Sequence, residues 1–200
     1  MSLVVSGSAA SNIAPIPEGT HLGVCFMLVD IGMQYNETFK NSSRKVVIGW
    51  EIPGETIELE DGVHNRTISK IYTSSLNESA NLRQDLAAWR GRDFTPEELE
   101  AFNLRNIIGT SCLINVVHKE KSNGSKVANI QSIMALPKGM EKGQLSEATV
   151  IFDLDTDPLQ KVESLPEWIS KMIKKSETYE ARFSNKPAMT EVEDDGELPF

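Results

Sequence analysis

The alternation of apolar and polar positions marks strands along the first two thirds of the chain. Residues 21–30 form a continuous apolar run, which predicts a buried strand. Apolar residues alternate with polar or small ones over 45–52, so a second strand is expected there, ended by Pro53 and Gly54. Further strands are expected over 66–76, 112–119 and 127–136. The last two flank a Ser/Asn/Gly turn and form a predicted hairpin.

The segment between the third and fourth expected strands has helical spacing instead. Leucine and tryptophan recur on one helical face over 80–89, and residues 95–98 supply an N-cap threonine, a first-turn proline and a capping-box glutamate. Three strands, a helical connection and two strands follow the chain order of a five-stranded OB-fold barrel. The sequence therefore predicts a mainly β fold of that type, although a small SH3-like barrel or a β-sandwich shows a similar order.

The chain beyond residue 140 is predicted to form an extension and then a tail. Apolar residues within 165–173 form one stripe of an amphipathic helix, expected to dock on the body or on a second copy of it. From residue 176 onward apolar content collapses, which predicts disorder. The expected organisation is a flexible segment 1–16, an OB-fold DNA-binding domain 17–140, an extension with the amphipathic helix 141–175, and a disordered acidic tail 176–200.

The net charge of −9 at first argues against a nucleic-acid ligand, because phosphate binding needs Lys and Arg. Its distribution changes that conclusion. Residues 1–140 hold 15 acidic and 13 basic side chains, a balance of −2, whereas 141–200 hold 14 acidic and 7 basic ones, a balance of −7. The body can therefore carry a local basic groove. Residues 1–17 lack the basic start and the apolar run of a signal peptide, so a cytoplasmic protein of the bacterial host cell, with no membrane partner, is expected.

A groove for single-stranded DNA needs cations for phosphates and flat side chains for base stacking. Arg66, Lys70 and Tyr72 share one parity of the third expected strand, and hence one face of the sheet. The other candidates come from the loops and strand ends at which OB folds bind oligonucleotides. They are Tyr35, Phe39, Arg44, Lys45, Lys119, Lys121 and Lys126.

Each candidate also has a purely structural explanation. Tyr72 either stacks on bases or is an ordinary strand aromatic, while Trp50 and Trp89 are expected in the core. The hairpin lysines are equally explained as solvated loop charges. The combination of these residues in one fold, rather than any single residue, favours DNA binding.

The segment 82–94, which contains Arg90 and Arg92, resembles a recurrent segment of phage-encoded OB-fold single-stranded-DNA-binding proteins. The resemblance extends to 70–76, 107–109 and 137–140. It implies binding of single-stranded DNA without sequence preference, in phage or prophage DNA replication or recombination. It also implies that Arg90 and Arg92 contact phosphate, although an Arg-to-carboxylate pair at the helix end explains them equally well.

The last residues of the sequence carry a second resemblance. A cluster of carboxylates precedes an aliphatic residue, a proline and a phenylalanine, as in the acidic tip of bacterial single-stranded-DNA-binding proteins. Such a tip is a bipartite ligand, with the aromatic ring for an apolar pocket and the carboxylates for a basic rim. We expect it to recruit replication or recombination proteins; the alternative is an acidic solubility tail, which gives no reason for the ring. The expected partner-binding residues are Glu193, Asp194, Asp195, Glu197, Leu198, Pro199 and Phe200.

The sequence contains no constellation of catalytic residues. It lacks a glycine-rich phosphate loop and a His-Glu-x-x-His motif, and its three histidines are scattered. Cys25 and Cys112 lie far apart in apolar runs, which predicts buried, reduced thiols. A non-enzymatic protein without metal or cofactor is expected, and assembly of several copies would improve coverage of a strand. The alternative is a phage structural or protein-interaction barrel that does not bind nucleic acid.

Overall fold

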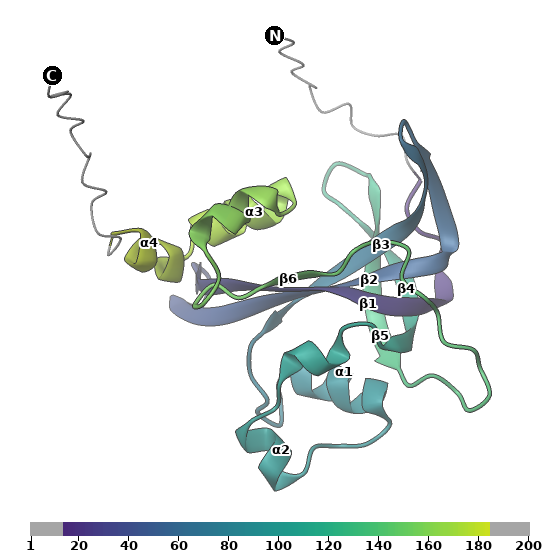
Figure 1. The fold of residues 1–200 in the computed structure, drawn as a ribbon, viewed down its shortest axis with the longest axis horizontal. Coiled ribbons are helices and arrows are strands. Elements are labelled where there is room, and N and C mark those ends of the chain that lie inside the picture. Colours follow the sequence, from purple (N-terminus) through teal and green to yellow (C-terminus); the bar gives the residue numbers. More distant parts are fainter. Residues whose placement is uncertain (1–13, 185–200) are drawn as a thin grey trace, which may run out of the picture.

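Long antiparallel strands form the centre of the protein, whose computed structural model describes residues 14–184. The strands are β1 (Gly19–Asn36), β2 (Asn41–Leu59), β3 (Gly62–Thr73), β4 (Ser111–Glu120) and β5 (Lys126–Met134). They build a curled sheet in the order β3-β2-β1-β4-β5 (Figure 1). The predicted mainly β architecture is therefore confirmed, as a half-barrel with β3 and β5 at its two ends.

Strand β1 is shared between the two halves of the sheet. Its first residues pair with β4, from Gly19 opposite Val116 to Val24 opposite Ser111. Its later residues pair with β2 as far as Asn36 opposite Asn41. Beyond this pairing with β4, the short strand β6 (Val150–Phe152) pairs in parallel with Met27–Val29 of β1.

The prediction that Pro53 and Gly54 end the second strand is wrong. Strand β2 continues to Leu59, and its register with β3 shifts between Ile52 and Thr56. Proline has no N–H to donate to a ladder, and an irregularity of this kind removes the need for one. The strand can therefore continue into a long hairpin beyond the body of the sheet.

The concave side of the sheet is filled by the segment between β3 and β4, which contains α1 (Asn81–Arg90), α2 (Pro96–Glu100) and the short 3-10 helix η1 (Leu104–Ile107). Trp50 and Trp89 are both buried here, with ring centroids 5.7 Å apart. Cys25 and Cys112 belong to the same cluster as free, buried thiols. Burial raises the pKa of Cys25 to about 12, so this thiol stays protonated at neutral pH.

A second core lies on the opposite face of β1 and β2. It is covered by η2 (Leu159–Ser164), α3 (Glu167–Lys174) and α4 (Glu177–Ser184) (Figure 1). Ile169 and Ile173 of α3 are fully buried against apolar residues of the sheet. The segment from β6 to α4 is thus part of the folded body, because β6 pairs with β1 and α3 packs on the face of the sheet.

The prediction of disorder from residue 176 is wrong for Glu177–Ser184, which form α4. Ser176 is fully buried, and its hydroxyl accepts a hydrogen bond from the backbone N–H of Tyr179 at 3.1 Å. Arg182 donates to the carbonyl of Leu154. Composition alone does not show such anchoring contacts. The predicted tail residues from 185 onward lie outside the described residues. Among residues 14–184, no helix is both long and apolar enough to cross a membrane.

Candidate nucleic-acid interface

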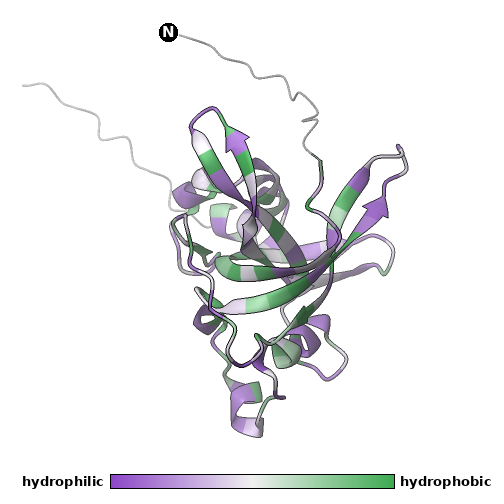
Figure 2. Ribbon diagram, turned by 90° about the vertical axis from the view of Figure 1, so that its right-hand side faces the viewer, coloured by the Kyte–Doolittle hydropathy of each residue, from purple (hydrophilic) through white to green (hydrophobic). Residues whose placement is uncertain are grey.

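Two hairpins project from the same end of the protein, one formed by β2 and β3 and the other by β4 and β5 (Figure 1). Figure 2, turned by 90°, shows them diverging toward their tips. A hollow of about 360 Å³ lies between their bases. It is lined by Arg66, Thr67, Ile68 and Ser69 of β3, by Lys126, Val127 and Ala128 of β5, and by Pro15 and Ile16. The two ends of the sheet therefore face each other across an open groove.

The β4–β5 hairpin, on one side of this groove, carries three lysines. Lys126 lines the hollow, and Lys119 and Lys121 are exposed on the same hairpin, beside one exposed carboxylate, Glu120. None of these lysines takes part in an ion pair with another residue of the described range 14–184. On the β3 side, the Arg66 guanidinium donates to the backbone carbonyl of Ala14. Two of the predicted DNA-binding residues, Arg66 and Lys126, thus line one groove, and two more, Lys119 and Lys121, lie on the hairpin beside it.

The residues that enter β1 form the floor of the groove and are held in place by His118. The Nε2 atom of His118 lies 2.8 Å from the carbonyl oxygen of Ile16, and its backbone N–H donates to Oε1 of Glu18 at 2.8 Å. Ile16 is 3% exposed. This anchoring gives the groove a fixed base between β3 and β5.

A third projection, the β1–β2 hairpin, carries exposed aromatic rings. Tyr35 is 59% and Phe39 is 75% exposed. The Oδ1 atom of Asn36 accepts hydrogen bonds from the backbone N–H groups of Thr38 and Phe39, and Lys40 follows with φ of 50°. The tip is therefore a structured turn with Phe39 exposed on it, and Tyr35 is exposed at the end of β1 just before it.

The expected common face of Lys70 and Tyr72 exists, but it points toward α1 and the core. Tyr72 is 3% exposed, and its hydroxyl donates to Oδ2 of Asp85 at 2.7 Å. The ammonium of Lys70 lies 2.6 Å from the same oxygen. Burial, assisted by the negative charge of Asp85, raises the pKa of Tyr72. Of the two explanations for Tyr72, the structure shows the core aromatic, whose ring offers no face for a base in this arrangement.

Arg90 and Arg92 both pair with Glu98 and connect α1 with the start of α2. Hydrogen bonds from Arg92 and from the backbone of Thr95 lower the pKa of Glu98 to about 2. The Arg90 guanidinium also lies over the ring of Phe94, 4.4 Å from its centroid. Of the two explanations for Arg90 and Arg92, phosphate contact and pairing with a carboxylate, the structure shows the pairing with a carboxylate.

Arg44 and Lys45, at the base of the β1–β2 hairpin, also have partners. Lys45 donates to the hydroxyl of Thr73 at 2.7 Å. Arg44 lies between Asp30 and Asp155, and its hydrogen bonds to Asp30 raise its pKa. Neither residue lines the groove between β3 and β5.

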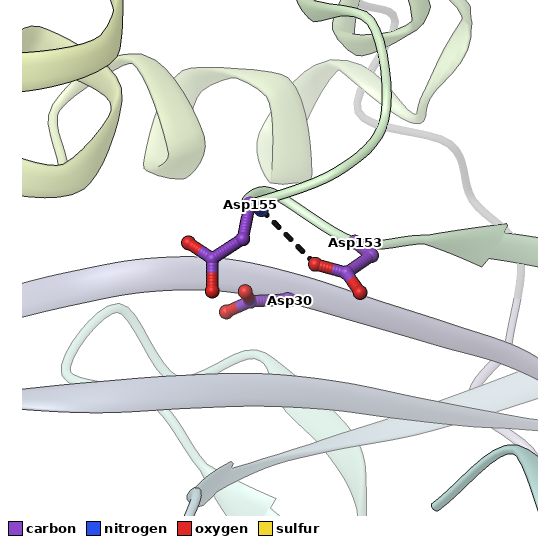
Figure 3. Close-up of side chains that lie close together, drawn as sticks. All are labelled: Asp30, Asp153 and Asp155. Atoms are coloured by element: carbon purple, nitrogen blue, oxygen red, sulfur yellow. Dashed lines mark hydrogen bonds between the residues drawn. The ribbon is translucent and has the colours of Figure 1, made fainter.

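Figure 3 shows three carboxylates that lie close together, those of Asp30, Asp153 and Asp155, and Arg44 pairs with the first and the last of them. Asp30 comes from β1 and the other two follow β6, with the backbone N–H of Asp155 donating to Oδ1 of Asp153 at 3.0 Å. Arg44 contributes positive charge to this cluster, together with Arg105, whose Nη2 lies 3.7 Å from Oδ2 of Asp153. Two arginine side chains of the protein therefore balance part of the negative charge of these carboxylates.

The sequence-based search for a site overlooked the acidic hairpin formed by β2 and β3. Glu58, Glu60 and Asp61 are exposed near its tip. The ring of His64 lies between Glu147 and Asp61, at 2.9 and 3.0 Å, and these two hydrogen bonds raise the pKa of His64. The contribution of this bridge to stability is fully present below the ordinary histidine pKa and is lost as the pH rises through the raised one. The run of acidic residues before Gly62 would have indicated this acidic hairpin from the sequence.

No protein-family model matches the sequence, and no curated protein matches it.

Proposed function

We propose that this chain binds single-stranded DNA without sequence preference, in the groove between β3 and β5, and acts in phage or prophage DNA replication or recombination in the bacterial cytoplasm. The observation that carries the proposal is an open groove lined by Arg66 and Lys126, with Lys119 and Lys121 exposed on the same β4–β5 hairpin and the three lysines free of carboxylate partners in residues 14–184. A lysine that already pairs with a carboxylate, as Lys70 does with Asp85, must give up that ion pair to bind phosphate. Free lysines release only counterions, which favours association at low salt.

The order of the strands supports an OB-type barrel as the scaffold. OB folds are five-stranded, partly open barrels that bind oligonucleotides through the second and third strands and through the loops that join strands 1–2 and 4–5. The corresponding loops of this chain carry Phe39 and Lys121, and β3 contributes Arg66 to the groove. The two aromatic rings of the β1–β2 hairpin lie toward the other end of β2, because Tyr35 pairs with Ser42 whereas Arg66 pairs with Ile52. They would form a separate stacking site for bases beyond the groove, at about 1–3 kcal/mol for each base.

The proposal is tested by fluorescence anisotropy of a labelled oligo-dT and of a duplex of equal length, each titrated with the full chain at 50 and 200 mM salt. We expect tighter binding of the single strand, with an affinity that falls steeply as salt rises. Binding of neither probe at low salt would overturn the proposal. Equal binding of both probes would leave only non-specific electrostatic attraction.

We further propose that the acidic tip, residues 193–200, recruits partner proteins of replication or recombination. Its support is the sequence pattern of carboxylates followed by Leu198, Pro199 and Phe200. Removal of these last three residues should leave the affinity for oligo-dT unchanged or raise it, because the loss takes away no cation. The anisotropy titration of the truncated chain measures this directly. A loss of DNA binding would contradict the proposal that the body binds DNA and the tip binds partner proteins.

The second candidate function is a protein-interaction barrel that does not bind nucleic acid. Two observations favour it. Tyr72, Lys70, Arg90 and Arg92 are engaged within the protein, and Leu59 and Val63 expose 48% and 69% of their surface on the β2–β3 hairpin. The same titration separates the two functions, because an interaction barrel leaves oligo-dT unbound at every salt concentration.

A further inference from the structure

A second hollow, of about 470 Å³, lies beside the C-terminal end of α1, between that helix, the segment before β4 and the chain that follows β5. We call it the α1 hollow. Its apolar lining comes from Trp89, Phe102, Ile107, Ala135 and Leu136. It shares no lining residue with the groove between β3 and β5. Its volume lies within the range of about 300–1,000 Å³ that is usual for sites of small molecules.

The wall of the α1 hollow is held by hydrogen bonds to the sheet. Trp89 is 7% exposed, and its indole N–H donates to the carbonyl of Ser111 at 3.0 Å. The N–H of Gly109 donates to the carbonyl of Cys25 at 2.8 Å, and the N–H of Cys25 donates to the carbonyl of Thr110 at 3.1 Å. A wall that is already ordered loses little conformational entropy when a ligand binds.

Both charged residues that line the α1 hollow are cations, Arg90 and Lys142, and no Asp or Glu of residues 14–184 lines it. Lys142 is exposed and takes part in no ion pair within that range. Arg90 shares Glu98 with Arg92, so this group of three keeps one positive charge in excess. The neighbouring Glu141 is exposed but is not part of the lining. The charge of the α1 hollow therefore favours an anion.

The surroundings of the two cations hold them at the α1 hollow. The Arg90 guanidinium lies over the ring of Phe102, 5.2 Å from its centroid, and its Nη1 is buried without a hydrogen-bond partner within residues 14–184. Part of its hydrogen-bonding capacity is thus uncommitted, and anionic oxygens are the acceptors that a guanidinium binds most strongly. The N–H of Gly143 donates to Oγ of Ser111 at 3.1 Å, which fixes the chain next to Lys142.

We infer that the α1 hollow binds a small organic anion with an aromatic or apolar body, such as an aromatic carboxylate, sulfonate or phosphate ester. The anionic group lies toward Arg90 and Lys142, and the body covers the apolar lining. Burial of the body supplies the non-directional part of the affinity, and the two cations set the orientation and exclude cationic ligands. This site is separate from the proposed DNA groove and does not depend on it.

The test uses anilinonaphthalene sulfonate, a fluorescent aromatic anion, and its uncharged analogue phenylnaphthylamine, each titrated with the full chain at 50 mM salt. We expect Lys142→Gln to weaken binding of the sulfonate about three- to fivefold, because one exposed charge pair is lost, and to change binding of the uncharged analogue by less than about twofold. The difference should shrink as salt rises, because exposed charges are then screened.

The matched control is Lys138→Gln. Lys138 is exposed in the same segment and does not line the α1 hollow, and its replacement changes the net charge equally. It should leave the affinity for both probes unchanged. A second variant, Ala135→Phe, places a ring in the hollow and should weaken both probes at least fivefold, with urea unfolding as the check that the chain is folded.

The inference is overturned by a folded chain that does not bind the sulfonate, by an unchanged affinity in Lys142→Gln or in folded Ala135→Phe, or by an equal loss in Lys138→Gln. Saturation with oligo-dT should leave binding of the sulfonate unchanged, because the groove and the α1 hollow share no lining residue. Displacement of the sulfonate by oligo-dT would show that the two are one site. A chain that binds the sulfonate but no oligo-dT would overturn the proposed function and leave this inference intact.

Discussion

Replacing Lys119, Lys121 and Lys126 together with alanine is expected to weaken binding of oligo-dT by about ten- to a hundredfold at 50 mM salt. Each exposed lysine-to-phosphate contact contributes about 0.5–1 kcal/mol, and the three contributions add because the side chains are separate and form no ion pair within residues 14–184. The salt dependence supplies a second number. The slope of log K against log salt should become shallower by about 2, since each phosphate contact of a single strand contributes about 0.7 to it.

A triple alanine variant of Lys161, Lys171 and Lys174 is the matched control for this measurement. It lowers the net charge by the same amount, but these lysines lie in η2 and α3 and pair with Asp157, Glu167 and Glu163. Anisotropy titrations at four salt concentrations give both the affinity and the slope for each variant. If the control loses as much affinity as the hairpin variant, the groove is not the binding site.

The strands and helices of the body follow from the sequence because their patterns are local. The apolar run at 21–30 and the alternation at 45–52 coincide with parts of β1 and β2, and the helical spacing at 80–89 coincides with α1. The true strands are longer than their apolar runs, because hairpin extensions such as 53–59 need no buried face. Their pairing depends on the partner strand, which a single run of residues does not reveal.

The candidate site shows a second limit of sequence reasoning. Strand alternation correctly places Lys70 and Tyr72 on one face, but it does not say which face is covered. The position of α1 decides this, since Asp85 of that helix receives both side chains. The hairpin lysines were predictable because a turn between two strands is almost always exposed. The position of Lys126 across the hollow from Arg66 depends on the curl of the whole sheet and was not predictable.

The carboxylate of Glu51 illustrates the same limit and leads to the largest expected effect on stability. The sequence shows an ordinary polar position in an alternating strand, yet this side chain is fully buried. Its oxygens accept hydrogen bonds from the Asn65 amide at 3.1 Å, from the backbone N–H and hydroxyl of Ser146 at 3.0 and 2.9 Å, and from the backbone N–H of Glu147 at 3.1 Å. Glu51 thus fastens the segment before β6 to the sheet.

Replacement of Glu51 with glutamine should lower the free energy of unfolding by about 2–4 kcal/mol at pH 7, because the new amide NH₂ faces donors that then lack an acceptor. Glu58→Gln, an exposed position on the same strand, is the control and should change it by less than about 0.5 kcal/mol. Urea unfolding gives both values, and equal midpoints for the two variants would contradict this role.

The pH dependence of the unfolding free energy gives an independent check on Glu51. Desolvation raises the pKa of this carboxyl, but the hydrogen bonds from Ser146, Asn65 and Glu147 outweigh it, so the pKa in the folded protein lies below 4.5. A carboxylate whose pKa is lowered by folding stabilises the protein above its unfolded pKa, and this contribution is lost as the pH falls through the folded value. The difference between the unmodified chain and the Glu51→Gln variant should therefore be constant from pH 6 to 7 and should narrow below pH 4.5, because protonation removes the charge that the four donors recognise.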